Sequence, residues 1–218
     1  FGVSPDRVTL IHRGVDLNRY PFFPRKYDGP NGDSFKIINV GRITPIKGHQ
    51  EFIRAVHLLS KRFQNFEAWI VGAADEKNQA YLRELKLMTA RLGLEPHIKF
   101  LGTRRDIPEL FQAADLLVLS SKIPEAFGRV LIEAGATGTA VIASRIGGIL
   151  DIIDDNQNGV LFSPENYEEM SLAMERLIRD RSLCKKFAQA LRKKLETEFS
   201  LEQMVEKTCR VYQEVRQQ

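Results

Sequence analysis

Short apolar segments alternate with longer amphipathic segments along most of the chain. The apolar segments are bounded by polar or glycine-containing turns, which predicts buried strands, and the segments between them repeat apolar residues at helical spacing. The expected strands cover residues 35–40, 68–71, 98–101, 116–119, 140–143 and 159–162. The expected helices lie around residues 52–59, 78–92, 107–113, after Gly128, after Gly147-Gly148, and at 165–180, 182–196 and 200–217.

This alternation predicts the fold class. Strands that alternate with helices form parallel sheets covered on both faces, and right-handed crossovers then produce a doubly wound, Rossmann-like α/β sheet. Ligands of such sheets bind outside the carboxyl ends of the strands. The polar motifs of this chain follow the predicted strands, so we expect them to lie at that edge.

We expect three parts in the chain. Residues 1–34 are a linker segment that includes a Pro- and Gly-rich loop at 21–33. Residues 35–198 form the Rossmann-like domain, and residues 199–218 form a final helix. The sequence starts at Phe1 and not at Met, so we expect it to be a piece of a longer protein.

Composition and charge restrict the function classes. Lys and Arg exceed Asp and Glu by 32 to 28, a balance that does not by itself indicate a nucleic-acid partner, and basic and aromatic residues are not interleaved. The chain has only two cysteines, so we expect no disulfide framework. This favours a reducing compartment. Neither a membrane-spanning apolar run nor a His/Cys cluster at metal spacing is present, so we expect no metal and no cofactor.

The turn after the first strand, residues 41–49, carries two cations. Gly41 allows a close backbone approach, Arg42 can hold a phosphate with two hydrogen bonds, and Lys47 adds a point charge. The residue after Lys47 is not Ser or Thr, so the turn is not a Walker A loop, and it lacks the G-x-G-x-x-G of dinucleotide folds. A polar turn with two solvated cations fits this pattern equally well.

Two glutamates, Glu125 and Glu133, flank a strand-to-helix turn at Gly128. A helix start offers free N–H groups and the positive end of a dipole, so Gly128 and Arg129 should present N–H groups to an anion, while we expect Phe127 in the core. Glu133 lies roughly 7–8 Å along the helix axis from Gly128. This spacing suits a ligand with an anionic centre and hydroxyl-rich rings on both sides, such as a nucleoside diphosphate sugar. The simpler alternative is a solvent-facing helix glutamate.

Two further turns follow strands. Thr103 and Arg104 come after the third strand, where a base could lie against the guanidinium, although a basic loop ahead of a helix is at least as good an interpretation. Gly147 and Gly148 follow the fifth strand, where tight packing alone would explain both glycines.

Together these segments resemble the retaining glycosyltransferases of family four, the group one transferases with the GT-B fold. The resemblance covers nearly the whole chain. The motifs that carry it are Gly41-Arg42 with Lys47-Gly48, Pro124-Glu125-Ala126-Phe127-Gly128, the Glu-x7-Glu span to Glu133, Val141-Ile142-Ala143-Ser144 with Gly147-Gly148, and Asn158-Gly159 with Leu161-Phe162.

The resemblance implies the carboxyl-terminal, donor-binding half of a two-domain enzyme. Residues 1–34 would then follow a missing amino-terminal, acceptor-binding domain, and residues 199–218 would cross back toward it. Such enzymes transfer a hexosyl group from a UDP-sugar or GDP-sugar with retention and without a metal. We expect a cytoplasmic enzyme acting on a saccharide, lipid or small acceptor in cell-envelope or polysaccharide synthesis, with peripheral contact at the inner membrane face left open.

The resemblance also implies roles for single residues. Arg42 and Lys47 would hold the diphosphate, and Glu125 would bind hydroxyls of the transferred sugar; these three are the expected catalytic residues. Glu133 would accept from the ribose hydroxyls, and the other donor-binding residues would contact phosphate or base. The implied donor-binding residues are Gly41, Thr103, Arg104, Phe127, Gly128, Arg129 and Glu133.

Some positions depart from the family pattern, and other functions stay open. His12-Arg13 stands where an Asn before the Gly is usual, and Asp151 replaces the usual Glu after the double glycine. The alternatives are a non-catalytic nucleotide-sugar-binding module and a GT-B sugar-nucleotide epimerase. The four charged residues Arg42, Lys47, Glu125 and Glu133 argue against a decayed site.

Overall fold

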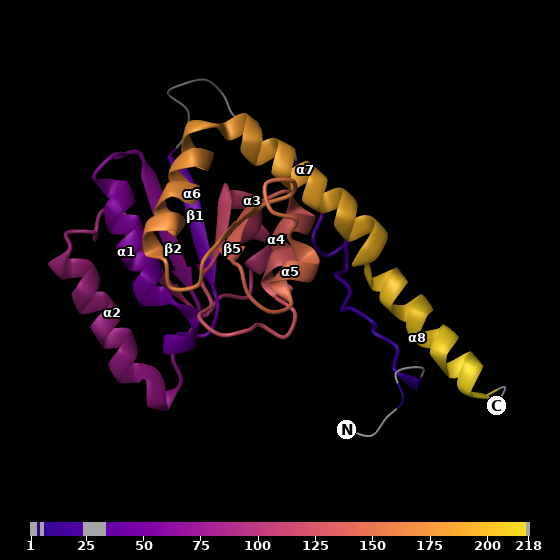
Figure 1. Cartoon of the computed structure of the whole chain (residues 1–218). Coiled ribbons are helices and arrows are strands. Elements are labelled where there is room, and N and C mark those ends of the chain that lie inside the picture. Colours follow the sequence, from indigo (N-terminus) through magenta and orange to yellow (C-terminus); the bar gives the residue numbers. More distant parts are fainter. Residues whose placement is uncertain (1–3, 5–6, 24–33, 217–218) are drawn as a thin grey trace.

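The computed structural model describes residues 4, 7–23 and 34–216 of the chain. In this part the strands form one parallel sheet in the order β3-β2-β1-β4-β5-β6, with helices on both faces (Figure 1). The prediction of a doubly wound, Rossmann-like sheet is therefore confirmed. The strands are β1 (Phe35–Val40), β2 (Phe66–Val71), β3 (Ile98–Gly102), β4 (Leu116–Leu119), β5 (Ala140–Ser144) and β6 (Val160–Phe162).

The helices fall close to their predicted positions. Two single turns of 3-10 helix, η2 (Pro45–Lys47) and η3 (Glu76–Asn78), precede the first two α-helices. Most of the predicted loop at 21–33 lies outside the described residues. The α-helices are α1 (His49–Ser60), α2 (Gln79–Arg91), α3 (Ile107–Ala113), α4 (Arg129–Thr137), α5 (Ile149–Ile152), α6 (Tyr167–Arg179), α7 (Arg181–Glu198) and α8 (Leu201–Arg216).

Successive residues of the central strands pack on opposite faces of the sheet. Ile37 of β1 and Leu116 of β4 belong to one core cluster, and their neighbours Ile38 and Leu117 belong to the other. All four side chains are completely buried. Both faces of the sheet need apolar cover, which explains why the strands read as continuous apolar runs and do not alternate with polar residues.

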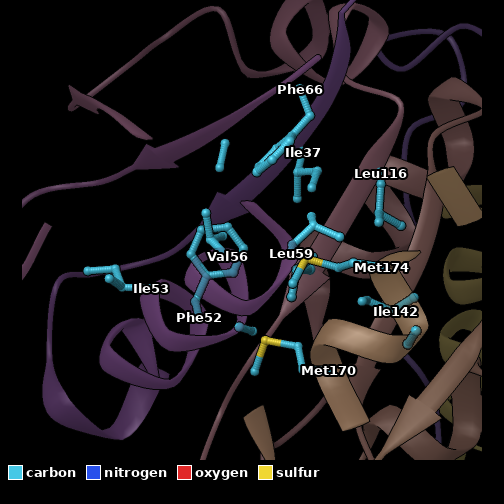
Figure 2. Packing of buried hydrophobic residues seen from close by; sticks show 14 of the residues in the cluster. Ile37, Phe52, Ile53, Val56, Leu59, Phe66, Leu116, Ile142, Met170 and Met174 are labelled. Atoms are coloured by element: carbon cyan, nitrogen blue, oxygen red, sulfur yellow. The ribbon is translucent and has the colours of Figure 1, made fainter. Parts of the chain in front are cut away.

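Helices α1, α2 and α6 cover the first face. Phe52, Val56 and Leu59 of α1 point toward the strands, and Met170 and Met174 of α6 fill the space beside them (Figure 2). This layer fixes where α1 begins, and with it the turn that joins β1 to α1.

Helices α3, α4 and α5 and the second half of α7 cover the other face. The small-residue run in α4 lies where α7 crosses it, since a Cβ added to Gly135 would come within 2.5 Å of Leu191 Cδ2. Such a close approach explains the small residues around Glu133 by helix packing.

The described N-terminal segment is attached to the junction of α7 and α8. Val15 N donates to Phe199 O at 2.8 Å, and Leu201 N donates to Val15 O at 3.0 Å. Helix α8 then extends away from the sheet (Figure 1) and contains no buried residue. No helix in the described ranges combines the length and the apolar character needed to span a bilayer.

Candidate functional site

A cleft of about 200 Å³ opens between the carboxyl ends of β1 and β4. These strands are neighbours at the point where the strand order reverses, which is where doubly wound sheets bind ligands. We call it the switch-point cleft. Its lining residues are Val40, Gly41, Arg42, Lys47, Leu119, Glu125, Gly128, Arg129 and Val130.

The cationic turn forms one wall of this cleft. It consists of η2 and Gly48, whose φ of +69° is the left-handed conformation that favours glycine. A Cβ at Gly48 would lie 1.9 Å from Ser120 O, and Ser120 Oγ donates to Lys47 O at 2.8 Å. The turn that carries Lys47 is thus fixed directly against the backbone that follows β4.

His49 lies beneath this turn as the first residue of α1 and is completely buried. Burial is the main cause that lowers the pKa of His49 to about 4, and the positive charge of Lys47 acts in the same direction. The backbone of Thr44 acts in the opposite direction. His49 is therefore neutral near pH 7, so it adds no charge beneath the turn.

Four charged side chains line the cleft, namely those of Arg42, Lys47, Glu125 and Arg129. Lys47 Nζ forms an ion pair with Glu125 Oε1, and Ser121 Oγ donates to the same carboxylate oxygen. The two paired side chains are 22% and 19% exposed, so the pair is partly shielded from water but open to a ligand. Arg42 lines the same cleft and is exposed, which leaves its guanidinium accessible to an anion.

Glycines of the β5–α5 turn support the segment that carries Glu125. Cβ atoms added to Gly147 and Gly148 would lie 2.7 Å from Glu125 O and 2.6 Å from Ala126 O. Gly148 N also donates to Glu125 O at 2.9 Å. Tight packing therefore accounts for this glycine pair. The contact of the two glycines with the backbone of Glu125 and Ala126 fixes the position of Glu125.

The start of α4 forms another wall of the cleft. Gly128 is its N-cap with a φ of +80°, and the cleft is bordered by Gly128, Arg129 and Val130. The first N–H groups of a helix have no partner within the helix and carry the positive end of its dipole. Cations from the β1 turn and N–H groups from α4 thus lie around one cleft, an arrangement suited to an anion.

Glu133 lies one turn further along α4 and lines a second hollow of about 240 Å³. We call it the α4 hollow. Arg129 borders both spaces, and its Nε lies 3.1 Å from Glu133 Oε1. The residues that line the α4 hollow are Gly14, Val15, Asp16, Arg19, Tyr20, Arg129, Ile132, Glu133 and Leu201.

The carboxyl group of Glu133 is desolvated. Its side chain is 14% exposed, and burial raises its pKa, whereas the charge of Arg129 and a hydrogen bond with Tyr20 act in the opposite direction. Burial is also the main cause that raises the pKa of Tyr20, and the negative charge of Glu133 adds to it. The two side chains therefore form a buried polar pair on one side of the α4 hollow.

Some predicted site residues lie apart from this cleft. Thr103 and Arg104 follow β3, which β2 separates from β1, and neither lines the switch-point cleft or the α4 hollow. Arg104 is exposed, and its Nε donates to Asp106 Oδ1 at 2.8 Å. The structure brings Gly41, Arg42, Lys47, Glu125, Gly128 and Arg129 together, with Glu133 in the adjoining hollow.

The expectation that Phe127 packs in the core is met in part. Phe127 is half-buried and packs against the core cluster that includes α4. Its ring lies 5.9 Å from the ring of His12 and 5.8 Å from that of the buried Phe199, so it lies at the edge of the core. The side chain of Phe127 does not line the cleft.

Two residues of the site were missed from the sequence. Ser121 holds Glu125, and its position just after an apolar strand is a signal that the strand-end rule could have used. Tyr20 lines the α4 hollow together with Glu133, which is 113 residues away in the chain, and no local pattern indicates that the two are neighbours. Among the residues that the structure describes, no group of three or more His, Cys, Asp or Glu side chains is placed to hold a metal ion.

The fold and the cleft define a Rossmann-like α/β domain with a cleft at its topological switch point that is lined by Arg42, Lys47 and the start of α4. Residues 24–194 match the family Glycosyl transferases group 1, and the chain belongs to this family. It corresponds to the carboxyl-terminal half of a GT-B enzyme, as the sequence resemblance predicted.

Solved structures agree with this assignment. The chain is 29% identical to Alr3699/HepE of Anabaena, determined in complex with UDP and glucose, with a TM-score of 0.87 over 97% of this chain and 58% of that chain. It is 30% identical to the C-terminal domain of the group 1 family protein LpcC from Francisella tularensis, with a TM-score of 0.78 over 86% of this chain and 100% of that chain.

Curated relatives are longer. The chain is 32% identical over 193 residues to a D-inositol 3-phosphate glycosyltransferase of Paenarthrobacter aurescens, an alignment that covers 83% of this chain and 45% of the relative. The chain spans about half the length of the curated relatives it matches.

Proposed function

We propose that this chain is the donor-binding domain of a glycosyltransferase and that the switch-point cleft binds the diphosphate of a UDP-sugar or GDP-sugar. One observation carries the proposal: Arg42, Lys47 and the first turn of α4 line a single cleft between β1 and β4. The complexes of the similar Anabaena protein with UDP and with UDP-glucose support a nucleotide sugar as the ligand.

The charges of the cleft suit the chemistry of glycosyl transfer. The diphosphate gains negative charge as the bond to the sugar breaks, and fixed donors stabilise that charge best when they are already in place. Arg42 can bind with two parallel hydrogen bonds, Lys47 supplies a point charge, and α4 supplies N–H groups. In this reaction the cations would stabilise the negative charge on the diphosphate, as a metal ion does in other transferases.

The two glutamates would bind the rings on either side of the diphosphate. Glu125 would exchange its bond to Lys47 for hydroxyls of the transferred sugar, and Glu133 would accept from the ribose hydroxyls. Arg129 lies between them and borders both spaces. A donor would thus place its diphosphate beside Arg129 and one ring on each side.

We further propose that the full protein is a retaining hexosyltransferase of the cytoplasm that acts on a saccharide, lipid or small acceptor. A separate amino-terminal domain would bind the acceptor, so this chain alone would bind donor without transferring the sugar. The length of the relatives, about twice that of this chain, supports a second domain. Contact with the inner face of a membrane would belong to the full protein.

Calorimetry with UDP and GDP tests the proposal. We expect the wild-type chain to bind at least one of them, and the double variant Arg42→Ala/Lys47→Ala to bind at least about 100-fold more weakly. Each charge-assisted hydrogen bond is worth about 1.5–3 kcal/mol, and tenfold in affinity corresponds to about 1.4 kcal/mol.

A matched control removes two cations elsewhere. Lys185 and Lys193 are exposed on α7, so Lys185→Ala/Lys193→Ala changes the net charge equally and should leave the affinity unchanged. Thermal unfolding of all three proteins checks that the cleft variant is folded. Equal binding by the wild type and the cleft variant would refute the proposed function.

A further inference from the structure

A lysine beside the switch-point cleft joins three parts of the domain. Lys122 lies in the loop between β4 and α4, and it is not among the residues that line the cleft. Its Nζ lies 3.3 Å from Glu51 Oε1 in the first turn of α1 and 2.7 Å from Glu165 Oε2 in the turn before α6. The ammonium group therefore connects the β4–α4 loop to α1 and to the β6–α6 loop.

Both partners of Lys122 are in unfavourable situations. Glu51 is 6% exposed, and its Oε2 is buried without a hydrogen-bond partner among the described residues. A buried carboxylate destabilises a fold unless a cation compensates it. Glu165 has a φ of +64°, which residues with a Cβ seldom adopt. Two such features meet at one ammonium group, and features of this kind cluster where a site is held in a fixed geometry.

The backbone of Lys122 is fixed against the cationic turn. Lys122 N donates to Ile46 O at 2.8 Å, in the turn that also carries Lys47. The side chains at positions 123 and 124 are exposed. The side chain of Lys122 is therefore the last one that the domain holds by an ion pair before the loop reaches Glu125.

The residue next to Lys122 holds the carboxylate of the cleft. Ser121 is 1% exposed, and its Oγ donates to Glu125 Oε1. Lys47 pairs with the same oxygen, but a diphosphate in the cleft would compete for that lysine. Ser121 would then be the donor that keeps Glu125 in place, so the position of the Ser121–Lys122 backbone decides where the carboxylate lies.

We propose that Lys122 is a positioning residue: by bridging Glu51 and Glu165 it fixes the loop that carries Ser121 and Glu125, so that the carboxylate is in place before a donor binds. The proposal rests on the proposed function, because its effect is measured on donor binding. Lys122 touches no ligand atom in this proposal and acts through Ser121 and Glu125.

The variant Lys122→Met removes the ammonium group and keeps an unbranched side chain. Calorimetry would compare UDP-glucose, UDP-N-acetylglucosamine and GDP-mannose, each with its own nucleoside diphosphate, and use the sugar that adds most to the affinity of the wild type. We expect this gain to be about tenfold in the wild type, which is the value of one charge-assisted hydrogen bond. In Lys122→Met it should fall to about twofold, while affinity for the nucleoside diphosphate stays the same.

A second variant excludes an effect of the unpaired buried carboxylate. Lys122→Met/Glu51→Gln removes both charges of the buried pair, so it should fold even where the single variant does not. It should show the same loss of the gain from the sugar. Thermal unfolding of each protein checks that it is folded.

Lys99→Met is the matched control. Lys99 Nζ pairs with Glu67 Oε2 at 2.8 Å and so joins β3 to β2, away from the cleft. This variant should keep the wild-type gain from the sugar.

Two kinds of result would contradict the proposal, and they are distinguishable. An unchanged gain in both Lys122 variants, an equal loss of affinity for donor and nucleoside diphosphate, or a wild type that gains nothing from any of the three sugars would overturn the positioning role and leave diphosphate binding intact. A wild-type chain that binds neither UDP nor GDP would instead refute the proposed function itself.

Discussion

The switch-point cleft and the α4 hollow each contain one glutamate of the same Glu-x7-Glu span, yet they hold it in different ways. Glu125 lies in a loop, pairs with Lys47 and accepts from Ser121, whose chain position is only four residues away. Glu133 lies inside a helix, is more deeply buried, pairs with Arg129 of the same helix, and lines a hollow that the N-terminal segment helps to form.

This difference shows what each region depends on. The cleft is assembled from turns at the ends of neighbouring strands, so the sheet itself sets its geometry. The hollow depends on the attachment of residues 14–20 to the α7–α8 junction and to α4. Changes to the β1 turn should therefore affect the whole domain, whereas changes in the hollow should have local effects.

The largest effect is expected for Gly48→Ala. The new Cβ would lie 1.9 Å from the backbone oxygen of Ser120 at a residue with φ of +69°, so the backbone of the β1 turn or of the segment after β4 would have to shift. We expect a loss of about 4 kcal/mol in the free energy of unfolding, measured with urea.

Gly93→Ala separates the two causes of that loss. Gly93 has a φ of +68°, but nothing lies within 4 Å of an added Cβ. We expect a loss of only about 1 kcal/mol from the backbone conformation. Similar losses in both variants would contradict the close approach between the β1 turn and Ser120.

The next effect is a pH dependence that comes from the cleft. The pKa of His49 is lowered to about 4, against 6.5 for an ordinary histidine. Between pH 4 and 6.5, His49 is therefore protonated in the unfolded chain and neutral in the folded chain. The contribution of neutral His49 to the free energy of unfolding is fully present above pH 6.5. It is lost as the pH falls toward 4, by up to about 3 kcal/mol at 1.36 kcal/mol per pKa unit. Urea unfolding between pH 7 and 4.5 should show a clearly shallower slope for His49→Gln than for the wild type, and equal slopes would count against a buried neutral His49.

The smallest effect comes from the hollow and has the opposite sign. Burial raises the pKa of Glu133, so its contribution to stability is complete below the ordinary carboxyl pKa and is lost as the pH rises through the folded value. The stability of Glu133→Gln relative to the wild type should therefore increase between pH 4 and 7. Glu202→Gln on α8, measured in the same way, is the matched control, because the side chain of Glu202 is exposed. A constant difference for Glu133→Gln would show that the carboxyl group is not desolvated.

Much of the cleft could be predicted because it follows from local rules. Apolar runs place the strand ends, and the carboxyl ends of parallel strands lie at one edge of a doubly wound sheet, so Gly41 and Glu125 were expected at that edge. Thr103 also lies at that edge, but the sheet order puts β2 between it and the cleft, and sequence gives strand type more readily than strand order. The place of Tyr20 in the α4 hollow could not be predicted, because it depends on how the N-terminal segment is attached to α7 and to the α7–α8 junction.

The Lys47–Glu125 pair also affects the free energy of binding in the switch-point cleft. An incoming diphosphate that takes the ammonium group leaves a carboxylate with one fewer partner close to its own negative charge. A bare diphosphate must bear that repulsion, whereas a donor that brings sugar hydroxyls can give the carboxylate new hydrogen bonds. Under the proposed function, this exchange of partners within one ion pair would favour binding of the intact donor over binding of the nucleoside diphosphate that is left after transfer.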